Sequence, residues 1–408
     1  MKKRLLSLLL VMVTVVVMLA SCGTKNETAE EPTVEQTEEG EDTVQTDEPE
    51  VTTPDVTDPN QEEDTEDDTE VEETREGYIR SELTNEWIDE KYANIRPLAM
   101  MIPNDKAALP HYNISQAGVL YQINVEGRIT RLMAIFDTWQ DLGDRIGNIR
   151  SARSYYVYWA LEWDPIFVHF GNPFYADAIL DSGLVADVDM LNLTKGTLES
   201  AGALTESGKN AHYYRATDRK APQNAYASST SLINAVNYKK YSMEHTSQYQ
   251  GTHYAFSNSV HTYADREDAF ECLSIDFKEC YPIDDTYFLY DAESETYLRY
   301  EYGEPHVDAA TGEQLSFTNV LIQFTRHQVL DAKGYLDFWF KENMSEDGEY
   351  YGGYYISEGI AIPIYWEKNE DYVQTKYYDM DGNEVIFNTG KTMVCIVELD
   401  DKEKLVLE

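Results

Sequence analysis

The chain has 408 residues, with 32 Lys and Arg against 75 Asp and Glu, so its formal net charge at pH 7 is −43. This excess argues against duplex nucleic acid as a partner, because the phosphates would be repelled rather than neutralised. The length exceeds that of one average domain.

The N-terminus has the pattern of a secretion signal. Lys2, Lys3 and Arg4 precede an apolar run from Leu5 to Ala20, which is short for a membrane span of about 20 residues. Leu19-Ala20-Ser21-Cys22 matches the lipobox, in which the thiol accepts a diacylglycerol before cleavage. We therefore predict a signal peptide over residues 1–22, lipid (palmitate) on Cys22 and a cell-membrane anchor on the extracytoplasmic face. An uncleaved anchor helix would also place the remaining chain outside.

The next segment is strongly acidic. Residues 23–77 contain 23 Asp or Glu but only two basic residues, and almost no large apolar side chain. Such a composition cannot bury enough surface to offset the entropy of ordering. We predict a disordered acidic tether, which as a flexible coil would span roughly 40 Å.

Residues 78–250 combine apolar runs with capped periodic segments, which predict strands and helices. The expected elements, in chain order, are strands over 98–102, 118–125 and 129–139, a helix with Ser151 or Ser154 as its N-cap that stops at Asp164-Pro165, a strand over 166–170, and helices over 175–182 and 228–238. This order predicts an α/β-like N-terminal domain with a mixed sheet flanked by helices.

Residues 251–408 are rich in Tyr and alternate in polarity between turn signals, a pattern typical of strands. The expected strands are 272–277, 287–290, 297–302, 319–325, 354–356, 360–366, 375–378, 385–387 and 392–398. We predict a mainly β C-terminal domain, so the fold class as a whole is α+β.

The remaining cysteines indicate neither a disulfide framework nor a metal. With Cys22 lipidated, the odd set of Cys272, Cys280 and Cys395 cannot pair completely, and buried small side chains are expected. His306 and Asp308 form a pair without further ligands nearby, so no metal is predicted. No cofactor is predicted either.

Arg150 and Arg153 are the first candidates for a binding site. They lie three residues apart at the start of a predicted helix, where free N–H groups and guanidinium groups together favour phosphate or carboxylate. The alternative is that both arginines form internal ion pairs of little consequence. The acids available for such pairs are Glu126, Glu162 and Asp164.

His169 ends a predicted buried strand, where open α/β sheets gather their ligand sites. If Glu126 faces the same place, then Glu126, Arg131, Arg150, Arg153 and His169 would form one polar cluster. A lone histidine more often makes hydrogen bonds within the core. Downstream, Arg215 and Lys220 belong to a locally basic segment that could close over an anionic ligand or pair with acidic surface.

Several segments resemble the YerB-like lipoproteins of Gram-positive bacteria. They are Arg96-Pro-Leu-Ala-Met-Met-Ile102, Glu126-Gly, Ile129-Thr-Arg-Leu-Met-Ala134, Ile149-Arg-Ser-Ala-Arg153, Phe167-Val-His169, Arg219-Lys-Ala-Pro222, His306-Val-Asp308, Thr311-Gly312, Asn319-Val320, Thr375 and Thr389-Gly-Lys-Thr392. The resemblance implies a signal and tether followed by two domains of unknown function, and it favours a ligand site at Arg150 and Arg153. The sequence departs from the family pattern at Pro103, Asn148 and Gln223.

These observations favour a membrane-anchored lipoprotein of unknown molecular function that binds an anionic wall or lipid-linked component of the cell envelope. One alternative is an envelope enzyme acting on a phosphate- or glycan-containing substrate, with His169 or Glu126 as acid or base and the arginines stabilising developing charge. Another is a protein docking module, because tyrosine is common at interfaces.

Overall fold

The computed structural model describes residues 74–191 and 212–408. The predicted signal peptide and all but the last four residues of the predicted tether lie outside the described residues. Within the described residues, no helix is both long enough and apolar enough to cross a membrane.

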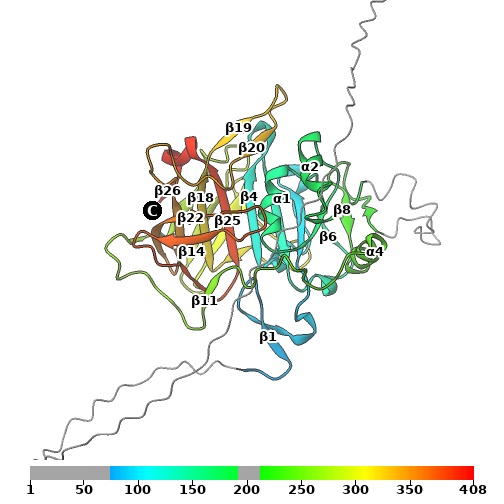
Figure 1. The fold of residues 1–408 in the computed structure, drawn as a ribbon, viewed down its shortest axis with the longest axis horizontal. Coiled ribbons are helices and arrows are strands. Elements are labelled where there is room, and N and C mark those ends of the chain that lie inside the picture. The colour runs from blue at the N-terminus through cyan, green and yellow to red at the C-terminus, as the bar shows by residue number, and fades with distance from the viewer. Residues whose placement is uncertain (1–73, 192–211) are drawn as a thin grey trace, which may run out of the picture. The chain divides into compact units, whose positions relative to one another are not determined.

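One mixed sheet of eleven strands forms the centre of the fold, in the order β12-β22-β21-β18-β25-β4-β5-β3-β7-β8 with β23 paired to β22 (Figure 1). Its strands are β3 (Leu98–Pro103), β4 (Val119–Asn124), β5 (Thr130–Phe136), β7 (Ile166–His169), β8 (Ala186–Asp189), β12 (Phe270–Glu271), β18 (Asn319–Thr325), β21 (Gly353–Ser357), β22 (Ile360–Glu367), β23 (Lys376–Asp379) and β25 (Thr392–Glu398). β25 runs parallel to both β18 and β4. The sheet therefore continues across the boundary predicted near residue 250.

The central strands are buried on both faces. Every residue of β4, β5, β18 and β25 is buried, which explains their near-continuous apolar runs in the sequence. Figure 1 shows α1, α2 and α4 together on the side of the sheet where β8 lies.

The helices are few and short. They are α1 (Ser154–Leu161), α2 (Asp177–Leu180) and α4 (Ser229–Lys239), with 3-10 helices η1 (Glu90–Tyr92), η2 (Lys106–Ala108), η3 (Ile114–Gln116), η4 (Glu126–Arg128), η5 (Trp139–Asp141), η6 (Phe174–Ala176) and η8 (Leu399–Lys404). α4 begins with a capping box between Ser228 and Ser231. The residue preceding α1 is Arg153, without a side-chain cap, so neither Ser151 nor Ser154 caps this helix.

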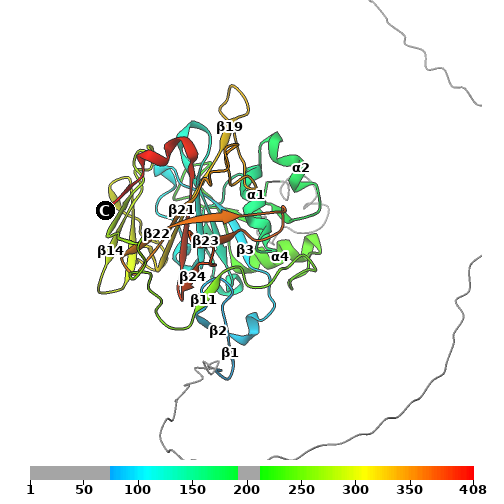
Figure 2. The same ribbon diagram turned by 60° about the vertical axis from the view of Figure 1, so that its left-hand side comes forward.

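Smaller sheets surround the central one. They are β1 (Tyr78–Arg80) with β2 (Trp87–Asp89); β6 (Ile146–Gly147), β10 (Ala225–Ala227) and β9 (Tyr214–Arg215); β11 (Ala255–Ser257) with β24 (Ile386–Asn388); β13 (Ser274–Asp276), β14 (Tyr287–Asp291), β15 (Thr296–Glu301), β16 (Glu304–Pro305), β17 (Ser316–Phe317) and β26 (Val406–Leu407); and the hairpin β19 (His327–Val329) with β20 (Leu336–Phe338) (Figure 2).

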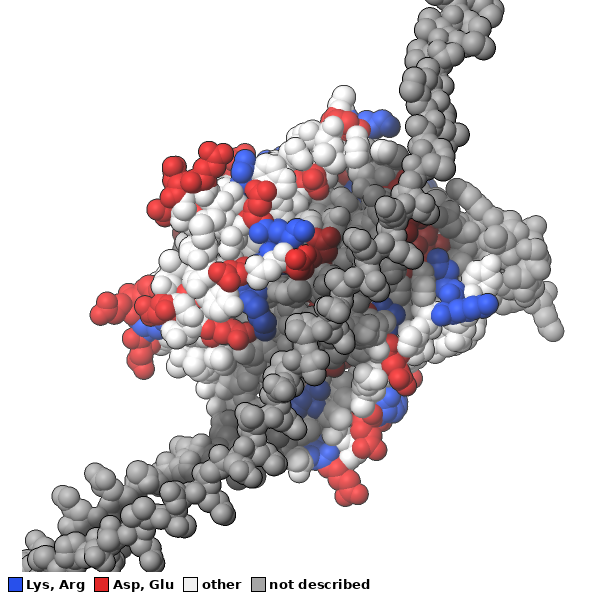
Figure 3. Space-filling model, in the orientation of Figure 1, with Lys and Arg blue, Asp and Glu red and all other residues white. Residues whose placement is uncertain are grey.

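The fold confirms the mixed sheet, and strands far outweigh helices. The finer division into an α/β-like and a mainly β domain stays a prediction. Cys272, Cys280 and Cys395 are free and buried, as expected. Acidic and basic side chains are scattered over the face in Figure 3.

Candidate functional site

The segment that carries Arg150 and Arg153 bridges the ends of two parallel strands. The N–H of Arg150 donates to the carbonyl of Met101 in β3 at 2.8 Å, and the carbonyl of Arg150 accepts from the N–H of Phe170, directly after β7, at 2.9 Å. The carboxyl ends of parallel strands lie at the same edge of a sheet, where α/β proteins commonly bind ligands. Arg150 therefore stands at this edge, and Arg153 follows in the same segment.

Arg153 is held by a carboxylate of the protein itself. Its Nε donates to Oε2 of Glu126 at 2.9 Å, a second guanidinium nitrogen contacts Oε1, and Nη1 donates to the carbonyl of Ala152 at 2.6 Å. Burial disfavours the charged form of Glu126, but the hydrogen bond and charge of Arg153 outweigh this effect and lower its pKa. For Arg153, the alternative of an internal ion pair therefore holds.

Arg131 and Arg150 have no such partner. Arg131, on β5, is 7% exposed and donates from Nη1 to the carbonyl of Ser151 at 2.7 Å. The Nε atoms of Arg131 and half-buried Arg150 have no hydrogen-bond acceptor. Across residues 74–191 and 212–408, neither guanidinium lies in an ion pair with a carboxylate.

The electrostatics of these two residues reflect their surroundings. Burial and then the charge of Arg153 lower the pKa of Arg131 to about 9. Burial also lowers the pKa of Arg150, although the charge of Asp105 opposes this shift. Both side chains remain cationic at neutral pH. We call Arg131, Arg150, Arg153 and Glu126 the arginine cluster.

The predicted basic segment contributes one neighbour to this cluster. The exposed Arg215 lies over the ring of Phe170, 4.8 Å from its centroid, and donates to Oδ1 of Asn224 at 2.7 Å. Its charge helps to lower the pKa of Arg150. Lys220 is exposed, and its side chain makes no hydrogen bond or ion pair with any other described residue.

Both ring nitrogens of His169 are engaged by groups of the protein itself. The ring is fully buried, with Nδ1 2.9 Å from the carbonyl oxygen of Gly171 and Nε2 2.5 Å from Oδ1 of Asp187. Since both neighbours accept hydrogen bonds, both ring nitrogens carry protons. Burial opposes the charge, but Asp187 and the carbonyl outweigh it and raise the pKa of His169. The ring therefore has no free nitrogen for a ligand or for proton transfer.

Glu162 and Asp164, the other acids that could have paired with the arginines, are engaged elsewhere. Glu162 accepts from Nζ of Lys368 at 2.8 Å and from the hydroxyl of Thr375 at 2.8 Å. Asp164 lies 3.1 Å from the guanidinium of Arg96.

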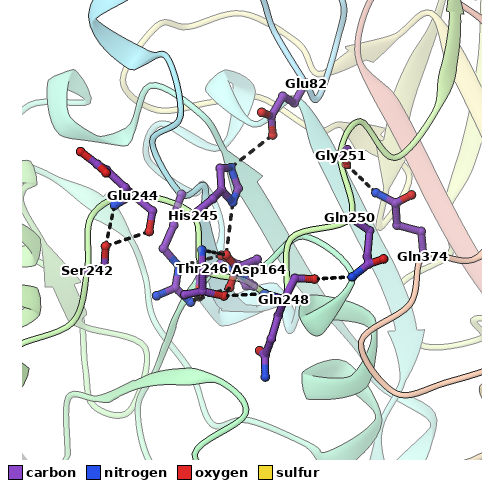
Figure 4. Close-up of polar contacts among 12 residues, drawn as sticks. Glu82, Asp164, Ser242, Glu244, His245, Thr246, Gln248, Gln250, Gly251 and Gln374 are labelled. Atoms are coloured by element: carbon purple, nitrogen blue, oxygen red, sulfur yellow. Dashed lines mark hydrogen bonds and ion pairs between the residues drawn. The ribbon is translucent and has the colours of Figure 1, made fainter. Parts of the chain in front are cut away.

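His245 completes the network around Asp164. Figure 4 shows the ring of His245 between the carboxylates of Glu82 and Asp164, each 3.3 Å from a ring nitrogen. The carboxylate of Asp164 also accepts from the N–H of Thr246 at 2.6 Å. These contacts leave the arginine cluster with Glu126 as its direct carboxylate partner.

A second polar cluster was missed in the sequence because its members are far apart in the chain. Contrary to the prediction that His306 has no further ligands nearby, His111 Nδ1 lies 3.0 Å from His306 Nε2, and Glu301 Oε1 lies 3.2 Å from His306 Nδ1. Arg299 contacts both His306 and Glu301.

The ligand atoms of His111, Glu301 and His306 lie within 4.8 Å of one another. Both ring nitrogens of His306 are nevertheless already engaged, Nε2 by His111 and Nδ1 by Arg299 and Glu301. His111 Nε2 lies 2.7 Å from the carbonyl oxygen of Pro103, which can only accept. The geometry is therefore a hydrogen-bonded chain in which Arg299 donates to His306, His306 to His111 and His111 to Pro103.

Comparison with known proteins places this architecture in a family. Residues 83–242 match "Protein of unknown function (DUF3048) N-terminal domain", and residues 275–394 match "Protein of unknown function (DUF3048) C-terminal domain". The chain belongs to this two-domain family. It is 27% identical over 322 residues to "Putative lipoprotein YerB" of Bacillus subtilis (strain 168), covering 78% of this chain and 86% of that protein.

The DUF3048 chain also shares its fold with a crystal structure of the YerB protein from Bacillus subtilis. The TM-score is 0.65 at 23% sequence identity, with 81% of this chain and 99% of that chain covered. The relative's name agrees with the prediction of a lipoprotein.

Pro103, Asn148 and Gln223 are the residues at which we expect this DUF3048 chain to depart from the family pattern. Asn148 donates to the carbonyl of Gln223 at 2.7 Å, and Gln223 donates to Oδ2 of Asp105 at 2.6 Å. Pro103 is paired with Arg131 in the sheet. The bond from Gln223 holds Asp105, whose charge acts on Arg150, in place.

Proposed function

We propose that this protein is a membrane-anchored lipoprotein, held on the extracytoplasmic face by lipid on Cys22, that binds an anionic component of the cell envelope at the arginine cluster. Arg131 and Arg150 supply the guanidinium groups that would bind the anion. The ion pair of Arg153 and Glu126 lies beside them, and Arg215 is the exposed neighbour. Lys220 and His169 are not needed for this role.

The observation that carries the proposal is that Arg131 has no carboxylate of its own. Among the described residues, this 7% exposed cation forms no ion pair, and it shares the charge of Glu126, which is paired with Arg153. Burial therefore costs folding free energy, because the lost hydration is only partly offset. Neighbouring Arg150 and Arg153 increase this cost. A bound anion would offset it, and planar guanidinium groups bind phosphate or carboxylate oxygens in pairs.

Arg150→Gln should weaken binding of inorganic phosphate at least tenfold, because a hydrogen bond to a charged group contributes about 1.5–3 kcal/mol. Calorimetric titration of the full-length protein in detergent measures the affinity. The matched control is Arg266→Gln, since Arg266 is already neutralised by Asp268 and Asp379 and should leave the affinity unchanged. Equal affinities in wild type and Arg150→Gln would refute the site.

Cys22→Ala tests the anchor. Without the thiol, the protein cannot take up a diacylglycerol, so fatty-acid label should disappear and the protein should leave the membrane fraction. Metabolic palmitate labelling followed by fractionation measures both. A variant that keeps its label would contradict lipidation at Cys22.

A further inference from the structure

Residues of the C-terminal DUF3048 segment reach the arginine cluster through the β19–β20 hairpin. A Cβ placed on Gly334 would lie 4.0 Å from the Cβ of Glu126, and the guanidinium carbon of Arg153 lies 5.5 Å from the ring centroid of Tyr335. Figures 1 and 2 both show this hairpin and α2 at the same end of the fold. The edge of the cluster is therefore built by both segments.

Aromatic side chains stand beside the cationic groups at this edge. Tyr335 packs against Tyr175, with ring centroids 5.6 Å apart, and the hydroxyl of Tyr175 donates to Oδ2 of Asp331 at 3.1 Å. The preceding residue, Phe174, is 81% exposed. Its ring centroid lies 5.9 Å from that of Tyr175, so Phe174, Tyr175 and Tyr335 form a row of aromatic rings that ends beside Arg153.

The charge of the cluster limits the kind of anion that fits it. Arg131, Arg150 and Arg153 carry three positive charges, and Glu126 carries one negative charge, which leaves two positive charges. Asp105 raises the pKa of Arg150 more strongly than Arg215 lowers it, so Asp105 offsets part of this positive charge. A phosphate monoester carries −1.5 to −2 charges at pH 7, whereas a carboxylate carries one.

We infer that the ligand of the arginine cluster is a sugar phosphate, whose phosphate group contacts Arg131 and Arg150 and whose ring lies against Tyr335 and Phe174. This inference rests on the proposed function and adds the chemical class of the ligand. Ligand sites commonly combine aromatic walls with a few placed polar groups in this way. The C–H face of a sugar ring would cover the exposed aromatic surface, while its hydroxyls remain hydrated.

The test compares three probes, inorganic phosphate, glucose 1-phosphate and glucose, by calorimetric titration of the full-length protein in detergent. Glucose 1-phosphate should bind about tenfold more tightly than inorganic phosphate, the equivalent of one aromatic contact. Glucose alone should not bind measurably. Tyr335→Ala should remove most of the advantage of glucose 1-phosphate while weakening inorganic phosphate less.

Two further variants keep the result interpretable. Phe174→Ala should also reduce the advantage of glucose 1-phosphate, and a side chain that is 81% exposed contributes little to folding. Tyr350→Ala is the control, because Tyr350 stacks on Tyr365 in another part of the fold, and should have no effect.

The outcomes separate the two proposals. Equal affinity for inorganic phosphate and glucose 1-phosphate, unchanged by Tyr335→Ala and Phe174→Ala, would overturn the sugar-phosphate assignment and leave anion binding intact. If neither phosphate binds, the proposed function falls and the ligand class falls with it.

Discussion

Lys368→Met should lower the free energy of unfolding by about 3–5 kcal/mol, because it leaves a buried carboxylate without its charge partner. Lys368 and Glu162 are both 0% exposed at their side chains, with Nζ and Oε1 2.8 Å apart. Burial opposes ionisation of Glu162, but Lys368 and His253 outweigh it and lower its pKa to about 2. Urea unfolding of the full-length protein at pH 7 measures the loss.

Two controls define the origin of this loss. The double variant Glu162→Gln with Lys368→Met removes both charges and should recover much of the stability, since a buried ion pair contributes little net energy over neutral groups. Lys376→Met breaks a pair with Glu384 whose side chains are 34% and 42% exposed, so it should cost less than about 1 kcal/mol. Lys368→Met with a loss as small as that of Lys376→Met would show that the buried pair does not stabilise the fold.

The ion pair between Glu162 and Lys368 also joins the N-terminal and C-terminal DUF3048 segments of the chain. Glu162 follows α1 in the first segment, whereas Lys368 and Thr375 follow β22 in the second. Their bonds join the segments on one side of the shared sheet, and the β4–β25 pairing joins them within it. Separating the segments would expose an unpaired charge and an open strand edge.

The strands were predictable where burial alone determines the pattern. Runs such as Leu98–Pro103 and Thr392–Glu398 are apolar because both faces are covered, and a short apolar run between turn signals predicts such a strand. The strands β6 and β9 have two residues each, which is too short to show the alternating hydrophobic pattern that predicts a strand. Pairing of β25 with β4 joins residues far apart in sequence, which no local pattern reveals.

The candidate site was predictable in its local part. Arg150 and Arg153 share one segment, and strand order brought Glu126 and Arg131 beside them. The contribution of Tyr335 could not be predicted, because it depends on a hairpin from the second segment reaching the first. His169 was placed in the cluster only on the condition that Glu126 faces the same place, because a strand pattern does not specify which face its last residue occupies.

The second large expected effect is a dependence of folding stability on pH that arises from Asp284. Its side chain is fully buried and accepts from the N–H of Thr130 at 3.3 Å and from the amide of Gln122 at 3.4 Å. Burial raises its pKa to about 7, although the hydroxyl of Thr130 opposes the shift. Between about pH 4, where the unfolded carboxyl titrates, and pH 7, the folded state holds the proton more tightly. Stability should therefore fall as pH rises through this window.

Asp284→Asn should remove this dependence, because the amide stays neutral. Relative to wild type, the variant should gain about 4 kcal/mol of unfolding free energy between pH 4 and pH 8, from three pKa units at 1.36 kcal/mol each. Urea unfolding at unit pH steps measures both curves. Asp218→Asn is the control of opposite sign, since a hydrogen bond from Arg145 lowers the pKa of exposed Asp218. Parallel curves for wild type and Asp284→Asn would show that Asp284 is ionised throughout and that its neighbours, rather than a proton, compensate its charge.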